Sequence, residues 1–323
     1  MKPTIATLGE FGLIEHIKTQ FPTPEGVEGI GDDCAILPQT TGLDTLFSTD
    51  LLVEGIHFLR QEIPPHLLGW KSAAVNISDI AAMGGKPTGT FLSIAFPKDL
   101  EMDWVEGFIS GYREISNRYD IPLLGGDTTG SQGPICINVG IMGQIPHGNS
   151  KLRAHAQAGD LICVTGNLGD SGIGLKIILD KLNHTDLYGQ DVDAQALIHR
   201  HYHPVPQVEA GLILSHCPGV HAMMDLSDGI GSDLRHILKA SHVGAHLDAS
   251  LLPLSAEAKR FCQRIGWEPS SFALNGGEDY QLLFTMDEDC RPETPYTVVG
   301  RITESLDLDI EHAPQEARGF HHF

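Results

Sequence analysis

Residues 66–85 read HLLGWKSAAVNISDIAAMGG, a pattern typical of a helix that the glycine pair at its end closes. Asn76 and Asp79 are three positions apart in this stretch, so on a helix they share one face. The segment before it, DTLFSTD at 44–50, is typical of a strand and is predicted to end on the carboxylate of Asp50. We therefore expect carboxylates to gather at strand ends, beside this helix.

The rest of the chain shows strand and helix patterns on both sides of a polar, turn-rich segment near residue 150. Before it, strands are predicted at 88–97, 121–127 and 135–145, and helices at 8–20 and 102–120. After it, a strand is predicted from residue 161, helices at 169–182 and 231–244, and a strand at 220–228 that ends on Asp225 and Asp228. The sequence thus predicts two α/β domains, residues 1–150 and 151–323.

The composition is that of a globular protein with a strong acidic excess. The 323 residues are 41% hydrophobic and 20% charged, and the formal net charge is -21. Such a charge repels nucleic acid backbones and anionic lipid surfaces, although an acidic enzyme can bind ATP through divalent cations. The six cysteines form no CxxC pair, and no signal peptide or run of 18 apolar residues is visible. We expect a cytoplasmic protein with no membrane and no nucleic acid partner.

Acidic residues recur beside glycine or a hydroxyl residue, each after an apolar run. The segments are GIGDDCAIL at 29–37, FSTD at 47–50, NISD at 76–79, LLGGDTT at 123–129 and MMDLSDG at 223–229. A turn or a helix cap explains any one of them alone. Five together in one cleft would repel each other without cations, and Mg²⁺ binds carboxylates jointly with substrate phosphates. The set therefore predicts a magnesium site that also holds phosphate groups.

Three common nucleotide-binding motifs are absent from the sequence. There is no GxxxxGK[ST] loop, no pair of HRD and DFG motifs, and no GxGxxG between a strand and a helix. An uncommon ATP-binding fold is therefore required.

Eight segments in order resemble the motif series of the thiamine-monophosphate kinase family, from Gly9 to Phe284: GEFGLI, GIGDDCA, STDLLVEGIHF, AVNISDIAAMG, GGDTTG, VTGNLGDS, DLSDGI and NGGEDYQLLF. The resemblance implies an α+β fold shared with aminoimidazole ribonucleotide synthetase: two α/β domains, ATP in the groove between them, and a homodimer whose N-terminal sheets join. It also implies that ATP phosphorylates thiamine monophosphate to thiamine diphosphate, with several Mg²⁺ ions at each site.

The same resemblance assigns site residues position by position. The residues that resemble metal ligands, or lie near the metal, are Asp33, Ser48, Thr49, Asp50, Asp79, Asp127, Asp225 and Asp228. Those that resemble ATP contacts are Gly126, Asp127, Arg153 and Ser227, and those that resemble contacts of the thiamine moiety are His57, Glu278 and Phe320. From the residues alone, Arg153 also reads as a solvated arginine, His57 as a half-buried histidine and Glu278 as a turn carboxylate.

The implied reaction requires no general base. The phosphate of thiamine monophosphate is mostly ionised at neutral pH, because its second pKa is near 6. The obstacle is repulsion between two anionic reactants that must align for in-line attack. We therefore expect direct transfer assisted by metal ions, with no catalytic side chain and no covalent enzyme intermediate.

Two other interpretations are open on the sequence. One is another ATP-dependent enzyme of the same superfamily, such as a ribonucleotide synthetase, a selenophosphate synthetase or a hydrogenase-maturation dehydratase. The other is a non-catalytic metal-binding protein, suggested by His199, His201 and His203 in HRHYH and by the terminal pair His321 and His322. Alternating histidines would converge on a metal from a strand but diverge on a helix, and AQALIHRHYHPVPQ reads as a helix that ends before Pro204.

Overall fold

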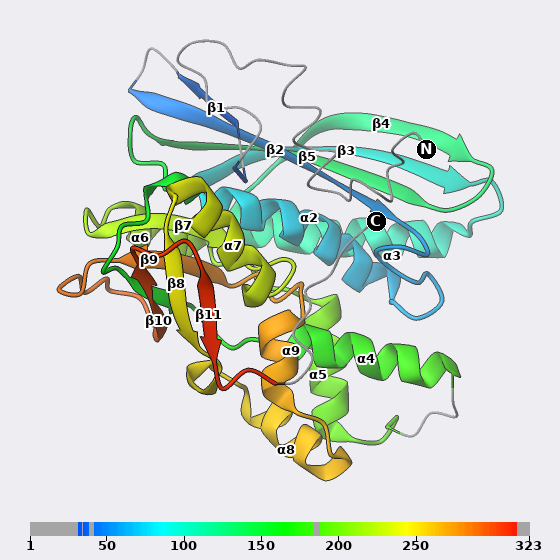
Figure 1. Ribbon diagram of the computed structural model, residues 1–323. Helices are drawn as coiled ribbons and strands as arrows, with labels where there is room; N and C mark the ends of the chain where they lie inside the picture. Colours follow the sequence, from blue (N-terminus) through cyan, green and yellow to red (C-terminus); the bar gives the residue numbers. More distant parts are fainter. Residues whose placement is uncertain (1–31, 34, 39–41, 184–187, 315–323) are drawn as a thin grey trace, which may run out of the picture.

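The computed structural model describes residues 32–33, 35–38, 42–183 and 188–314. The helix predicted at 8–20 lies outside these residues. The first half of the described chain forms a five-stranded sheet with two helices against one face (Figure 1). Its strands are β1 (Ala35–Pro38), β2 (Leu43–Val53), β3 (Lys86–Pro97), β4 (Leu123–Ser131) and β5 (Cys136–Pro146), in the order β1-β2-β5-β3-β4.

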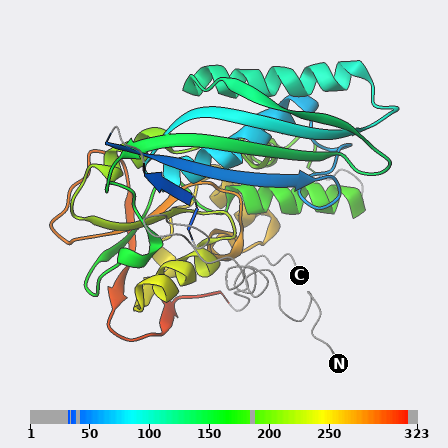
Figure 2. The same cartoon turned by 90° about the horizontal axis from the view of Figure 1, so that it is seen from above.

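Only β3 and β4 run parallel within this sheet, as far as its described strands show. Helix α3 (Met102–Tyr119) connects them, since parallel neighbours need a crossover. The strands run side by side in Figure 2, where the sheet is seen from above. Among the described residues, helices therefore cover only one face of this sheet.

Helix α2 (Pro65–Ala82) corresponds to the helix predicted at 66–85, and it lies between the two halves of the molecule. Pro65 occupies its first turn, and Gly84 follows its end with a φ of +78°, a value that favours glycine. The helix packs against the first sheet, α3, α6 (Val208–Ser215) and β7 (Val220–Asp225), so 14 of its 18 residues are buried. Its buried polar side chains must therefore find partners within the protein.

The second half forms a six-stranded sheet in the order β11-β8-β10-β6-β9-β7. Besides β7, its strands are β6 (Leu161–Val164), β8 (Gly244–Asp248), β9 (Leu282–Met286), β10 (Thr297–Thr303) and β11 (Leu308–Glu311). The remaining helices are α4 (Asp170–Asn183), α5 (Val192–Tyr202), α7 (Ile230–Ser241), α8 (Ala256–Ile265) and α9 (Pro269–Asn275). Short 3₁₀ turns, η1 (Arg153–His155) and η2 (Ala249–Leu251), complete it.

Two of the predicted strand ends are wrong. β2 continues past Asp50 to Val53, and β4 continues past Asp127 to Ser131. Both strands keep their partners through the acidic residue, β2 against β5 and β4 against β3, so nothing interrupts the ladder there. β7 does end at Asp225, and Asp228 lies in the loop that follows. Only part of the carboxylate set therefore comes from strand ends.

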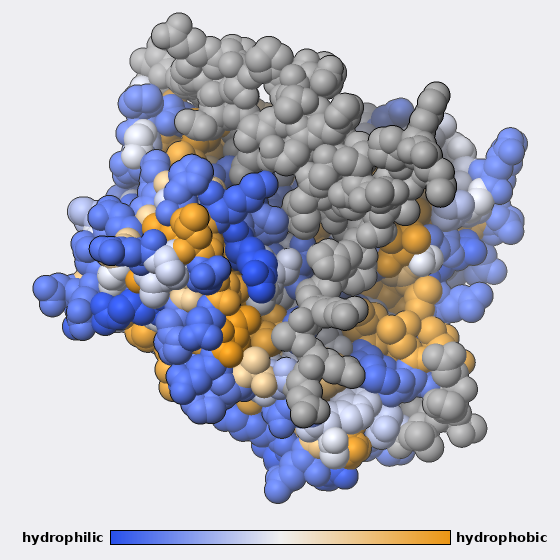
Figure 3. Space-filling view, in the orientation of Figure 1, coloured by the Kyte–Doolittle hydropathy of each residue, from blue (hydrophilic) through white to orange (hydrophobic). Residues whose placement is uncertain are grey.

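The surface is largely hydrophilic on the face that Figure 3 shows. On the face shown in Figure 3, hydrophilic side chains cover the outer parts and hydrophobic side chains gather in the middle of the view. Among the described helices, none is both long enough and apolar enough to cross a bilayer.

Glycines let the helices around α2 approach closely. A Cβ on Gly69 of α2 would lie 1.9 Å from the carbonyl oxygen of Phe108, and a Cβ on Gly111 of α3 would lie 1.7 Å from that of His66. Real Cβ atoms do not approach oxygen so closely, so the two helices are in backbone contact at both glycines. Larger residues at either position would separate α2 from α3.

We expect Gly111→Ala to lower the free energy of unfolding by about 1–2 kcal/mol, because the clash outweighs the gain of roughly 0.5–1 kcal/mol that Ala brings to a helix. Urea denaturation measures the change. Gly133→Ala is the control, since a Cβ there meets no atom within 4 Å. A Gly111→Ala protein as stable as the parent would contradict the close contact.

Candidate active site

A cavity of about 700 Å³ lies between the two halves of the chain. The first half lines it with Asp50 from β2 and Asp79 from α2, and the second half with Asp225 from β7 and Glu278 from the segment before β9. Its volume falls in the range of small-molecule sites. The cavity therefore has room for a nucleotide or a substrate of similar size.

Three carboxylates meet on one side of this cavity. Asp33, Asp79 and Asp225 each present an oxygen that lies within 4.8 Å of the others. Asp50 and Asp228 line the same cavity. These residues come from four of the five acidic segments of the sequence, so these four segments gather as expected, whereas Asp127 of the remaining segment does not line the cavity.

The environment opposes ionisation of Asp50, Asp79 and Asp225. Burial raises the pKa of Asp225 to about 7 and that of Asp50 to about 6, and Asp33 adds to both shifts. Burial also raises the pKa of Asp79 well above its ordinary value, with Asp50 and Asp225 as further causes. Like charges in a buried site disfavour each other. A cation would relieve this repulsion and favour the ionised forms.

Side chains of α2 and β2 hold the carboxylates in place. The Ser48 hydroxyl donates to Asp79 Oδ2 at 2.5 Å, and the Ser78 hydroxyl donates to Asp225 Oδ2 at 2.5 Å. The side-chain oxygen of Asn76 accepts a hydrogen bond from the backbone N–H of Asp50 at 3.0 Å. Consecutive turns of one buried helix thus fix β2 and β7 relative to each other.

Asp33 is bound by Arg153 on one side only. The Arg153 guanidinium donates to Asp33 Oδ1 and lies 3.4 Å from Asp32 Oδ1. Burial opposes the charge of Arg153, but Asp33 and Asp32 raise its pKa. Asp33 Oδ2 is buried and has no hydrogen-bond partner among the described residues. An acceptor oxygen of this kind beside two more carboxylates fits a Mg²⁺ site.

Helix α7 fixes the loop after β7 through hydrogen bonds to Asp233. The carboxylate of Asp233 accepts hydrogen bonds from the backbone N–H groups of Ser227 and Asp228, both at 3.1 Å. Gly277 packs against this loop so closely that a Cβ there would lie 2.1 Å from the Ser227 carbonyl oxygen. Ser227 and Asp228 are held at the cavity wall as a result.

Glu278 is paired with a buried lysine. Lys71 of α2 is 1% exposed, and its Nζ lies 3.1 Å from both carboxylate oxygens of Glu278. His201 Nδ1 lies 3.4 Å from Glu278 Oε2. Burial alone would raise the pKa of Glu278, but the charge and hydrogen bond of Lys71 hold this pKa below its ordinary value. Burial, with Lys71, lowers the pKa of His201 to about 3, so this histidine is neutral at neutral pH.

The same end of the cavity has an apolar wall. Ile56, Leu175 and Phe272 line it together with His57. His57 Nδ1 accepts a hydrogen bond from the Val53 N–H at 3.0 Å, which fixes the ring in the turn after β2. The cavity therefore has a carboxylate-rich end and an end with apolar side chains and a neutralised ion pair.

Some predicted site residues do not line this cavity. Thr49 points to the opposite face of β2 from Asp50, as period-two alternation requires, and its hydroxyl accepts a hydrogen bond from Asn138 at 2.8 Å. Gly126 and Asp127 are exposed on β4, three strand positions from β2 in the sheet. Phe320 lies outside the described residues.

The three histidines of HRHYH do not converge. They lie on α5 and at its end, where His201 hydrogen-bonds with Ser171 and the ring of His203 stacks on Trp70 at 3.9 Å. His199 stacks on His203 at 4.9 Å. In the described part of the chain, these histidines belong to no group that could hold a metal ion. The arrangement gives no support to the metal-binding alternative.

Two functional contacts had no clear sequence signal. Ser78 directly precedes Asp79 in NISD, but the sequence does not show that its hydroxyl reaches Asp225, 147 residues away. Lys71 lies 207 residues from its partner Glu278. A lysine in the middle of an otherwise apolar helix pattern was the available signal, because such a charge needs a buried partner.

Family models match both halves of the chain. The N-terminal domain of AIR synthase related protein matches residues 31–145, and the C-terminal domain of the same family matches residues 157–310. Thiamine-monophosphate kinase of Escherichia coli (strain K12) is 39% identical, over 98% of this chain and 98% of the relative. That of Bacillus subtilis (strain 168) is 32% identical, over 98% and 100%.

Solved structures agree with these relatives. The structure described as "AaThiL complexed with AMPPCP and TMP" has a TM-score of 0.91 and 35% identity, and the match covers all of both chains. Thiamine-monophosphate kinase from Stenotrophomonas maltophilia K279a has a TM-score of 0.75 and 35% identity, over 94% of this chain and 98% of that one. E. coli HypE, at 20% identity, TM-score 0.65 and coverage of 86% and 85%, shows the fold alone. The chain therefore belongs to the thiamine-monophosphate kinase family of AIR synthase related proteins.

Proposed function

We propose that this chain transfers the terminal phosphoryl group of ATP to thiamine monophosphate, giving ADP and thiamine diphosphate. The observation that carries the proposal is the convergence of Asp33, Asp79 and Asp225 in a cavity between the two halves. A relative with 35% identity over its whole length is described with AMPPCP and TMP bound. The cavity here has a polar end for phosphates and an apolar end for a ring.

Asp33, Asp50, Asp79 and Asp225 are the residues that would hold Mg²⁺, with Asp228 beside them. An ion held by these residues would supply positive charge beside the phosphates and so would reduce the repulsion between the two anionic reactants. Ser48 and Ser78 orient Asp79 and Asp225 through the hydrogen bonds already described. The protein's part in the reaction is then positioning, and the proposed transfer is direct and in line.

The other proposed contacts divide between the two ends of the cavity. Ser227 stands at the carboxylate-rich end, where its loop approaches Asp225, and Arg153 reaches that end through Asp33. His57 and Glu278 stand at the apolar end, where a thiamine moiety would lie. Phe320 stays a proposed stacking partner from the sequence. The limits of the domains, 1–150 and 151–323, also stay a prediction.

A second copy of the chain is the proposed partner of the open sheet face. Phe47 and Phe91 are 41% and 38% exposed on the face opposite to α2, and a Cβ on Gly140 between them would lie 3.7 Å from the Phe47 ring and 3.8 Å from the Phe91 Cβ. Leu51 is exposed on the same face. Across the sheet, Leu51 pairs with Asn138, Asn138 with Ser93, and Ser93 with Asp127, so Asp127 lies in the same row as Leu51. A homodimer joined through these sheets would cover the apolar side chains and place Asp127 and Gly126 near the second copy.

The reaction itself is tested by mixing the protein, ATP, Mg²⁺ and thiamine monophosphate and measuring thiamine diphosphate by chromatography. We expect Asp79→Asn to lower kcat about 100-fold or more, because it removes a charge from the phosphate end. Asp103→Asn, an exposed change on α3, should leave kcat unchanged. No thiamine diphosphate from the parent protein would refute the proposal, and a phosphorylated protein formed with ATP alone would refute direct transfer.

Stabilisation by Mg²⁺ should increase with pH. The folded-state pKa values of about 6 for Asp50 and 7 for Asp225 lie above the ordinary value of 3.8. The folded state therefore binds more protons than the unfolded state between about pH 4 and 7. Without metal, the contribution of these two groups to the free energy of unfolding falls as pH rises through that window. Protons and Mg²⁺ compete for the same oxygens. The rise in Tm on adding MgCl₂ should be small at pH 5 and full near pH 8.

Thermal scans with and without MgCl₂ at pH 5 to 8 measure this difference. In Asp225→Asn the Mg²⁺-dependent rise in Tm should be smaller at pH 8, because one ionisable ligand is gone. An equal rise at pH 5 and pH 8 in the parent protein would argue against carboxylate ligands.

The homodimer is tested by sedimentation. We expect the parent chain of 35.0 kDa to sediment at about twice that mass, and Phe91→Lys to sediment as a monomer because a charge replaces apolar contact area. Leu306→Lys, at an exposed apolar residue outside this face, should remain a dimer. A monomeric parent protein would exclude the proposed interface. If Asp127 serves the second copy's site, mixed Asp79→Asn and Asp127→Asn subunits should regain activity.

A further inference from the structure

His201 is a buried histidine of the cavity wall to which the proposed function gives no role. It lies near the end of α5 and is 4% exposed, and it lines the cavity together with Glu278 and Phe272. The imidazole is neutral at neutral pH, because burial lowers its pKa to about 3. A neutral imidazole has one donor nitrogen and one acceptor nitrogen, so its tautomer decides what it offers to a ligand.

A close contact between α4 and α5 fixes the position of this ring. A Cβ on Gly174 of α4 would lie 2.3 Å from the Leu197 carbonyl oxygen and 3.1 Å from the His201 Cβ. Arg200, the neighbour of His201, donates to Asp170 Oδ2 at the start of α4 at 2.7 Å. Both contacts hold the start of α4 against the last turns of α5, so the ring is a fixed part of the cavity wall.

Two polar groups on one side of the ring set the tautomer. His201 Nδ1 lies 3.0 Å from Ser171 Oγ and 3.4 Å from Glu278 Oε2. The charge of Lys71 keeps Glu278 ionised, so this carboxylate only accepts hydrogen bonds. An unprotonated Nδ1 would direct its lone pair at the negative oxygen, whereas both neighbouring oxygens attract Nδ1–H. The proton therefore belongs on Nδ1, and Nε2 is the acceptor.

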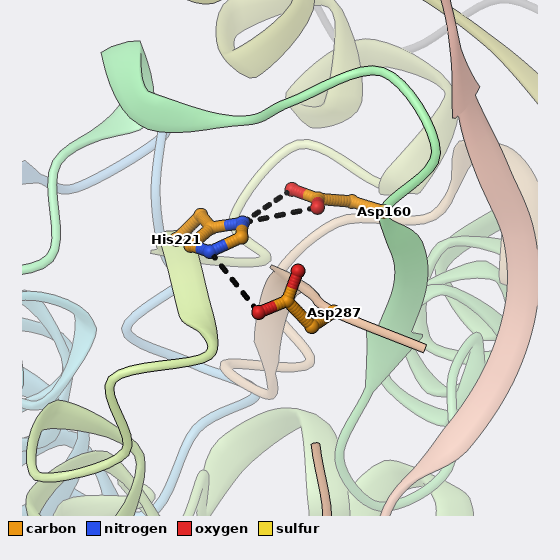
Figure 4. Close-up of side chains that lie close together, drawn as sticks. All are labelled: Asp160, His221 and Asp287. Atoms are coloured by element: carbon orange, nitrogen blue, oxygen red, sulfur yellow. Dashed lines mark hydrogen bonds and ion pairs between the residues drawn. The ribbon is translucent and has the colours of Figure 1, made fainter. Parts of the chain in front are cut away.

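The acceptor nitrogen of His201 is not engaged by the protein. Among the described residues, Nε2 has no hydrogen-bond partner, and it is not sealed from the cavity that His201 lines. His221 shows the opposite arrangement (Figure 4). Asp160 lies 3.0 Å from its Nδ1 and Asp287 lies 3.6 Å from its Nε2, so carboxylates occupy both sides of that ring. His201 therefore keeps one ring nitrogen for a ligand in the cavity.

We propose that His201 Nε2 accepts a hydrogen bond from the amino group of the substrate's pyrimidine ring, and so selects an aminopyrimidine over a ring with a carbonyl group at that position. The inference rests on the proposed function, which places a thiamine moiety beside Glu278. The amino group of the pyrimidine is the one N–H donor of that moiety. Opposite a carbonyl oxygen, Nε2 would face a second acceptor and stay unpaired, which is costly in a buried place.

The probe is oxythiamine monophosphate, in which a carbonyl oxygen replaces the amino group. The full chain is given ATP, Mg²⁺ and either monophosphate, and each diphosphate product is measured by chromatography. We expect the parent protein to prefer thiamine monophosphate by about 10-fold or more in kcat/KM. His201→Phe keeps a planar ring without an acceptor nitrogen, so its preference should fall to about twofold or less. His201→Leu takes its place if circular dichroism shows that the phenylalanine variant is unfolded.

His199→Gln is the matched control and should keep the preference of the parent protein, since His199 is exposed on the same helix, outside the residues that line the cavity. Damage to the fold would lower both rates and leave their ratio unchanged. A parent protein with no preference, or a preference that survives in a folded His201→Phe, would overturn the role of His201 alone. No thiamine diphosphate from the parent protein would overturn the proposed function and this inference with it.

Discussion

Repulsion between buried carboxylates is the constraint on which the rest of this structure depends. Asp33, Asp79 and Asp225 present oxygens within 4.8 Å of one another, and burial together with the neighbouring carboxylates raises the pKa of Asp79 and Asp225. The positive charge of Arg153 lies beside Asp33. The fold must therefore hold three groups together that would otherwise move apart or take up protons. Asp79 on α2 and Asp225 at the end of β7 are held by regular elements, whereas Asp33 lies in a bend before β1 and is held by Arg153.

Helix α2 is the element that makes this possible. It is buried on nearly all sides, yet it carries Lys71, Asn76, Ser78 and Asp79, and each of these polar side chains has a named partner. The partners lie on β2, on β7 and in the segment before β9, so they come from both halves of the chain. The backbone contact with α3 at Gly111 keeps the helix in this position. Packing and site geometry are thus properties of the same helix.

The elements that the sequence predicted well are those with strong local patterns. The helix at 66–85 was recognisable because its apolar residues and closing glycines lie within 20 positions, and α2 confirms it. The gathering of Asp residues from four acidic segments was predictable from their recurrence, but Asp127 lies elsewhere because β4 is three strand positions from β2 in the sheet. The end of β2 was predicted wrongly, because strand length depends on pairing with β5, which lies some 90 residues later in the chain. The pairing of Lys71 with Glu278 exists only in the folded state.

That ion pair changes how the apolar end of the cavity should be understood. A free carboxylate at Glu278 would attract a cationic ring by net charge, but Lys71 balances that charge at 3.1 Å. What remains is a fixed dipole beside Phe272 and Leu175. Glu278 has a φ of +63°, an uncommon value for this residue type, and its N–H donates to the Ser227 carbonyl oxygen at 2.8 Å. The loop therefore holds Glu278 in an unfavourable conformation that only its partners stabilise, as is common at ligand sites. The cavity thus combines a strongly anionic set of carboxylates with a glutamate whose charge Lys71 balances, and under the proposed function this asymmetry would favour one orientation of a molecule that has a phosphate and an aromatic ring.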